Sequence, residues 1–205
     1  MLRYAMALSV ATFCLTGCPS HHGGPGTAHG NDLILSRFGI PEFVGRPNRC
    51  PSTNGEGDIE LSYDNGQTRV KGECHGGVMV GDWEAWYVNG AKVWEANFEH
   101  GLIDGDFTSW YANDQKMAEA EFSKGVPEGD FEAWWRNGEK RAEGKFAGGR
   151  KAGCWKTWHD NGEKESEGAY QEDRKVETWT YWSASGQKHK EKLGGDADQG
   201  DCGWF

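Results

Sequence analysis

The chain has 205 residues, with 22 Lys and Arg against 32 Asp and Glu, which gives a formal net charge of −10 at pH 7. A surface of this sign repels phosphate groups, so nucleic acids and anionic lipid headgroups are excluded as expected partners. The 31 glycines and the 13% aromatic content are together typical of all-β repeats rather than of a disordered chain.

Residues 1–17 read as a signal peptide and are set apart from the fold. Arg3 supplies a positive charge, and the apolar run "AMALSVATFCL" is too short to span a bilayer as a helix of the mature protein. The next residues, "LTGC", end at Cys18 and resemble the lipobox of bacterial lipoproteins. That resemblance implies that Cys18 is lipidated, with palmitate among its acyl chains, and anchors the chain to a membrane. The alternative is a plain secretory peptide with an incidental cysteine.

Pro19 stands where inner-membrane lipoproteins of enteric bacteria carry aspartate, so the resemblance implies the outer membrane, on its periplasmic or its surface side. Loss of residues 1–17 leaves 21 Lys and Arg against 32 Asp and Glu, a net charge of −11. Residues 18–54 then hold the lipidated cysteine, a flexible tether and, at 33–44, a candidate cap for the first hairpin. The tether histidines are expected to be solvated rather than to bind a metal: His21, His22 and His29.

Four further cysteines, Cys50, Cys74, Cys154 and Cys202, are an even number in an exported chain, which indicates disulfides with three possible connectivities. We favour the pairs Cys50–Cys74 and Cys154–Cys202, because each pair would pin one end of the chain's repeat array. A metal site is the alternative, but the chain has no CxxC or HxxxH spacing that supports one. No cofactor is expected.

A 24-residue unit is written six times, and we number its positions 1 to 24. The consensus is roughly G-D-[WF]-x-x-W-[YW]-x-N-G-x-K-x-x-E-x-x-F-x-x-G. The first unit has fewer aromatic residues and the last lacks its opening glycine, as is typical of terminal repeats that act as caps. The units begin at Gly57, Gly81, Gly105, Gly129, Gly153 and Glu177.

Each unit predicts one β-hairpin. Asn-Gly at positions 9 and 10 is a strong hairpin signal and predicts a type I′ turn, which needs positive φ at both central residues. A second glycine, as at Gly101 and Gly125, turns the chain into the next unit. Two strands cannot bury a face alone, but stacked units can. The sequence therefore predicts an all-β fold, a single elongated antiparallel β-meander over residues 55–193, with a C-terminal tail or cap at 194–205.

Side chains alternate between the faces of a strand, which sorts the repeat positions. The aromatic residue at position 3 is expected on one face, where the Gly or Ala at position 16 leaves room for a neighbouring ring. Lys at position 12 and Glu at position 15 predict solvated rows of charge, each pair contributing well under 1 kcal/mol.

The segments "WYVNGAK" at 86–92, "WYANDQK" at 110–116, "WWRNGEK" at 134–140 and "WHDNGEK" at 158–164 resemble the MORN-repeat-variant family of bacterial proteins. The resemblance covers about residues 57–193 and implies the same hairpin-repeat architecture. Members of that family are often described as antitoxins of toxin–antitoxin pairs. A lipidated, exported chain departs from the usual cytoplasmic antitoxin.

Catalysis has no support in the sequence, which has no GxSxG, HExxH or phosphate-binding glycine loop, so we expect a protein that is not an enzyme. His159, at a position that is otherwise aromatic, is expected to be a tolerated substitution rather than a general base. A contact surface is the better hypothesis, because position 6 carries a row of tryptophans. The alternative is that the sheet curls and these rings stack into the core. The row is Trp86, Trp110, Trp134, Trp158 and Trp182.

Three functions follow from this. The first is a non-catalytic interaction module or scaffold on the envelope that binds an unknown protein. The second is a cell-wall glycan-binding repeat protein that stacks sugars on the rings. The third is an immunity or antitoxin protein of a toxin pair.

Overall fold

A computed structural model describes residues 48–51, 55–194 and 202. The proposed signal peptide, Cys18, the tether histidines, the candidate cap and almost all of the tail lie outside these residues. Within them, no helix is long and apolar enough to cross a membrane.

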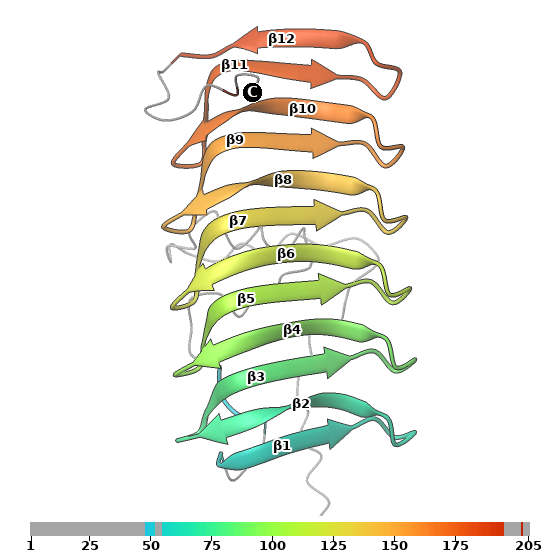
Figure 1. The fold of residues 1–205 in the computed structure, drawn as a ribbon, viewed down its shortest axis with the longest axis vertical. Coiled ribbons are helices and arrows are strands. Elements are labelled where there is room, and N and C mark those ends of the chain that lie inside the picture. The colour runs from blue at the N-terminus through green and yellow to red at the C-terminus, as the bar shows by residue number, and fades with distance from the viewer. Residues whose placement is uncertain (1–47, 52–54, 195–201, 203–205) are drawn as a thin grey trace, which may run out of the picture.

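Twelve strands form one antiparallel sheet in which every strand pairs with its neighbours in sequence, so the predicted all-β meander is confirmed (Figure 1). The strands are β1 (Gly57–Ser62), β2 (Thr68–His75), β3 (Val78–Trp86), β4 (Lys92–Glu99), β5 (Leu102–Trp110), β6 (Lys116–Ser123), β7 (Val126–Trp134), β8 (Lys140–Ala147), β9 (Arg150–Trp158), β10 (Lys164–Gln171), β11 (Arg174–Trp182) and β12 (Lys188–Lys192).

The turn inside each hairpin differs from the prediction. In the second repeat the Gly90 N–H donates to the Tyr87 carbonyl at 2.9 Å, and the Tyr87 N–H donates to the Ala91 carbonyl at 2.8 Å. Gly90 has φ 88°, but Asn89 is not among the residues with positive φ. This is a three-residue loop, a type I turn closed by a left-handed glycine, so the type I′ prediction is wrong here. Asn89 accepts a hydrogen bond from the Ala91 N–H through its side chain (3.2 Å), which is the role of asparagine in such a loop.

Turns with two left-handed residues occur instead between the repeats. His100 (φ 52°) and Gly101 (φ 80°) join β4 to β5, and Lys124 and Gly125 repeat the pattern one unit later. The opening residue of each repeat also has positive φ within its strand, as at Gly105 (φ 105°). Next to these positions the pairing with the preceding strand slips by two residues: Ala96 pairs with Phe107, but Phe98 pairs with Ile103. The opening glycine therefore supplies the positive φ of a β-bulge that bends the strand.

One face of the sheet is the core. The aromatic residues at position 3 are at most 2% exposed in repeats two to six: Trp83, Phe107, Phe131, Trp155 and Trp179. They pack with the aromatic residues of position 18, as in the edge-to-face pair Phe131 and Phe146 with centroids 5.5 Å apart. Stacking neighbouring repeats buries these rings, which a single hairpin could not do.

Position 16 is matched in size to the position-3 ring of the next repeat. A Cβ added to Gly144 would lie 2.2 Å from Cδ2 of Trp155, and the same overlap occurs between Gly72 and Trp83 and between Gly168 and Trp179. Where the next ring is the smaller phenylalanine, position 16 is alanine: Ala96 faces Phe107 and Ala120 faces Phe131. The expectation of a small residue beside a ring is thus confirmed. In addition, position 16 is Gly where the facing position-3 ring is Trp, and Ala where that ring is Phe.

Both favoured disulfides are present, Cys50–Cys74 and Cys154–Cys202. The first ties residues 48–51 to the beginning of the array, where Asn48 donates its N–H to the Gly101 carbonyl and accepts from the Met79 N–H at 3.0 Å. The second brings the C-terminal region to β9. Closing loops of 24 and 48 residues stabilises a fold by about 3–4 kcal/mol each in the chain-entropy account.

Candidate functional site

The face opposite the core, which we call the open face, carries repeat positions 2, 4, 6, 12, 15 and 17. Its most regular feature is the tryptophan row of position 6, one ring from each of β3, β5, β7, β9 and β11. All five rings are partly exposed: Trp86, Trp110, Trp134, Trp158 and Trp182. They therefore lie outside the core, which is formed by the position-3 rings instead, and each of them is the last residue of its strand.

Each ring of the row lies beneath a lysine of the preceding repeat. The distance from lysine Nζ to the ring centroid is between 5.1 and 5.8 Å in all five cases, within the range of a cation–π contact. Trp182 has a second lysine, Lys188, at 5.2 Å. The pairs are Lys71 with Trp86, Lys92 with Trp110, Lys116 with Trp134, Lys140 with Trp158 and Lys164 with Trp182.

Carboxylates hold these lysines in place. Lys92 Nζ lies 2.7 Å from Glu84 and 2.6 Å from Glu95. Partial burial would lower the pKa of Lys92, but its hydrogen bonds to both carboxylates outweigh that effect and raise it. Lys71 and Lys92 in turn lower the pKa of Glu84. The predicted rows of Lys and Glu are therefore ordered networks that include the tryptophan rings.

A second ladder, at position 7, joins successive repeats. The Tyr87 hydroxyl donates to the carbonyl of Trp110 at 3.1 Å, 23 residues ahead. Trp135 makes the equivalent bond through its indole N–H (2.9 Å), and His159 makes it through Nε2 to the Trp182 carbonyl (2.9 Å). Since the acceptor is a carbonyl, Nε2 of His159 carries the proton. His159 thus takes the place of a tyrosine donor in this ladder.

This ladder was not anticipated from the sequence, although a signal was present. Position 7 is Tyr, Tyr, Tyr, Trp and His in the first five repeats, and all of these side chains can donate a hydrogen bond. Ser183 ends the series where no repeat follows. Position 9 forms a parallel ladder through its asparagines, as in Asn113, which donates to the Arg136 carbonyl at 2.9 Å.

A hollow of about 610 Å³ lies over β5 to β9, beside the tryptophan row. Lys145 is its one lining lysine. Six of its lining residues are acidic: Asp106, Glu119, Glu121, Asp130, Glu132 and Glu143. Two further findings describe its charge. Asp106 and Glu121 stand directly opposite each other on paired strands, and among the described residues neither has a cation within ion-pair distance.

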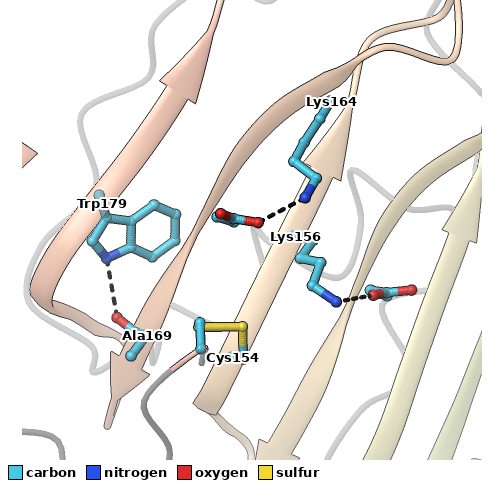
Figure 2. The surroundings of a disulfide bond; sticks show 8 residues. Cys154, Lys156, Lys164, Ala169 and Trp179 are labelled. Atoms are coloured by element: carbon cyan, nitrogen blue, oxygen red, sulfur yellow. Dashed lines mark hydrogen bonds and ion pairs between the residues drawn. A yellow bond between two sulfur atoms is a disulfide. The ribbon is translucent and has the colours of Figure 1, made fainter. Parts of the chain in front are cut away.

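Glu143, at the far side of the hollow, is more strongly compensated. Burial would raise its pKa, but hydrogen bonds from Lys140 and Lys156 outweigh burial and lower it. The Cys154–Cys202 disulfide borders the hollow, with the Lys156 ion pair (3.0 Å to Glu143) and the Lys164 ion pair (2.7 Å to Glu167) nearby (Figure 2). On the other side of the sheet Trp179 donates its indole N–H to the Ala169 carbonyl at 3.1 Å.

The described residues hold no group of three His, Cys, Asp or Glu side chains placed to bind a metal ion. The candidate residues that the structure brings together are the two cysteine pairs and the five tryptophans; Cys18 lies outside the described residues. The hollow was not predicted, because its shape depends on how the sheet bends.

Comparisons with known proteins add little. No protein-family model matches the chain, and no curated protein matches it. Among solved structures, a protein of unknown function from Bacteroides fragilis aligns with 68% of this chain and 91% of its own, at 9% identity and a TM-score of 0.14. A likeness this weak indicates neither fold nor function.

Proposed function

We propose that this chain is a lipid-anchored repeat protein of the bacterial envelope, of the MORN-repeat-variant type, whose open face binds another protein without catalysis. The observation that carries the proposal is the row of five partly exposed tryptophans on the face that the core does not use. Tryptophan offers large contact area together with a polar N–H, and it is enriched in protein interfaces.

Charge complementarity indicates the chemistry of the partner. The hollow beside the row is lined by six carboxylates, of which Asp106 and Glu121 have no cation within ion-pair distance among the described residues. Like charges opposite each other on paired strands destabilise a sheet, and a cationic side chain between them would remove that repulsion. The partner that fits is a protein with a basic segment that enters the hollow and an apolar or aromatic surface that meets the row.

The same rings could stack sugars, which is the second candidate function. Stacking requires an open ring face, and each ring in the row already has a lysine Nζ within 5.8 Å of its centroid. A glycan would have to displace that ammonium and disrupt its ion pairs with glutamates. This cost favours a protein partner over a glycan.

The test is affinity capture from an envelope extract with the full chain, in parallel with pelleting on purified peptidoglycan. Three baits are compared: the native chain, Trp134→Ala, and the charge-neutral double variant Asp106→Asn with Glu121→Gln. We expect one basic protein to bind the native chain, to bind each variant less well, and to be released by salt, since exposed charge pairs are screened. If the captured protein is a toxin, the immunity version of this function is supported.

Two results would overturn the proposal. One is retention on peptidoglycan alone that Trp134→Ala abolishes, because the row would then be a sugar-stacking platform. The other is a captured protein whose binding is the same for all three baits, because the open face would then not be the contact surface. Melting temperatures of the variants close to that of the native chain serve as the control for folding.

A further inference from the structure

The last hairpin is paired differently from the five before it. In the repeats before it, position 6 is opposite position 12 and one residue of the return strand then bulges, so that Trp83 faces Ala96. In the last hairpin Trp182 is opposite Lys188, but no residue bulges, and Trp179 faces Glu191. The absence of one bulge shifts every following residue of β12 to the other face of the sheet.

The residues of β12 explain why. With the usual bulge, Lys190 and Lys192 would occupy positions 14 and 16, both directed to the core face beside Tyr181 and Trp179. Burying two unpaired ammonium groups there would be strongly unfavourable. Without the bulge these lysines join Lys188 on the open face, and His189 and Glu191 face the core side instead, with His189 stacked on Tyr181 at 6.4 Å.

This register matters because the sheet of the described residues is an open meander whose two edge strands, β1 and β12, lie at its opposite ends (Figure 1). In principle β1 of a second copy could pair with β12 and continue the array, a head-to-tail contact that forms open filaments. Inside the array, every junction of this kind places Gly or Ala against the position-3 residue of the next repeat. At the β12 edge the residue on that side is Glu191, which β1 of a second copy would cover with Ile59.

We infer that β12 is a stop strand, which prevents a second copy of this chain from adding its β1 and extending the sheet. All five of its residues are exposed, it is 5 residues long where the other return strands have 8, and it directs a carboxylate to the core side. Short edge strands and inward-directed charges are known means of blocking edge pairing. The open-face lysines would attract Asp58 and Glu60 of β1 in a second copy, but exposed pairs are weak, and burial of the Glu191 carboxylate opposes the contact.

The test restores the repeat consensus in β12 of the full chain, with Lys190→Ala, Lys192→Gly and Gly194→Phe. Lys188 and Glu191 already match the consensus and stay. We expect sedimentation velocity to show a native chain that is monomeric and a triple variant that shifts with concentration to dimers and longer species. The matched control adds Ile59→Lys, which places a charge on the edge that should dock. It should return the triple variant to the monomer.

Three outcomes would overturn the inference. A triple variant that is folded by circular dichroism and stays monomeric means that β12 is not the barrier. Association that Ile59→Lys does not suppress means aggregation through the new phenylalanine. A native chain that associates, and becomes monomeric with Ile59→Lys, means that β12 does not stop extension. If the triple variant does not fold, the single variant Glu191→Ala is the test, because it keeps the register of β12. Association of Glu191→Ala that Ile59→Lys suppresses supports the inference. A Glu191→Ala variant that shows no such association overturns it.

Discussion

The size match between positions 16 and 3 yields the most specific prediction for stability. Gly144 takes no left-handed φ, so its backbone would accept alanine. Its neighbour Trp155 would not, because the added Cβ would lie 2.2 Å from ring atom Cδ2, against an ordinary carbon–carbon contact of about 3.5–4.0 Å. The substitution Gly144→Ala therefore has to displace a buried indole that is 2% exposed.

The expected cost follows from two opposing effects. Overpacking a core typically costs about 1–3 kcal/mol, and replacing Gly by Ala returns about 0.4–1 kcal/mol through the unfolded chain. Gly144→Ala should thus destabilise the protein by about 1–2 kcal/mol, which lowers the melting temperature by about 2–8 °C for a chain of this size. Trp155→Phe alone should also destabilise, because it opens a cavity and removes the indole bond to the Lys145 carbonyl (3.1 Å).

The double variant decides the matter. Gly144→Ala with Trp155→Phe recreates the Ala–Phe pair that the chain already uses at Ala96 and Phe107. We expect a favourable coupling of about 1–3 kcal/mol between the two changes in a thermal-melting cycle with the disulfides intact. Costs that simply add, or a Gly144→Ala variant as stable as the native chain, would refute the size rule.

Further predictions concern single side chains. Ser109 Oγ is a buried polar atom without a hydrogen-bond partner among the described residues. Ser109→Ala should therefore increase the free energy of unfolding by about 1 kcal/mol, which would be measured as a higher melting temperature. His159→Phe should cost about 1 kcal/mol in the same assay by leaving the Trp182 carbonyl unbonded, and His159→Tyr should restore it; equal melting of the two variants would contradict this. Burial, more than its charged neighbours, raises the pKa of Tyr170 to about 12, so its contribution to stability is present below pH 10 and is lost as pH rises from 10 toward 12. Tyr170→Phe should reduce that loss in denaturation measured across this range, whereas an unchanged pH profile would contradict the effect of partial burial on this hydroxyl.

Much of the fold was readable because the repeat is written six times. The period fixes the hairpins, and a side-chain alternation of two residues places position 3 on one face and position 6 on the other. The disulfide pairs could be chosen because the array leaves two ends to be pinned. The Asn-Gly turn type was wrong because the same dipeptide serves the three-residue loop, in which asparagine at position 9 bonds its own loop and only position 10 is left-handed, as at Asn89 and Gly90.

Other features depend on contacts between repeats that one repeat's sequence does not show. The position-7 ladder joins side chains to carbonyls 23 residues ahead, as from Tyr111 to Trp134 at 2.9 Å. The acidic hollow arises where the bent sheet brings β5 to β9 together. The changed register of β12 follows from Lys190 and Lys192, whose effect appears only when the alternative pairing is compared with the observed one.

The central claim is that the two faces of the sheet have different roles, one stabilising the fold and the other free for contact. The most direct measurement compares the melting temperatures of two aromatic truncations on the same strand, Phe131→Ala and Trp134→Ala. We predict that Phe131→Ala, at 1% exposure, costs about 3–5 kcal/mol. Trp134→Ala should cost about 1 kcal/mol, because it loses a partly exposed ring and its cation–π contact with Lys116. Equal and large losses for both would contradict the claim, since the tryptophan row would then be part of the core.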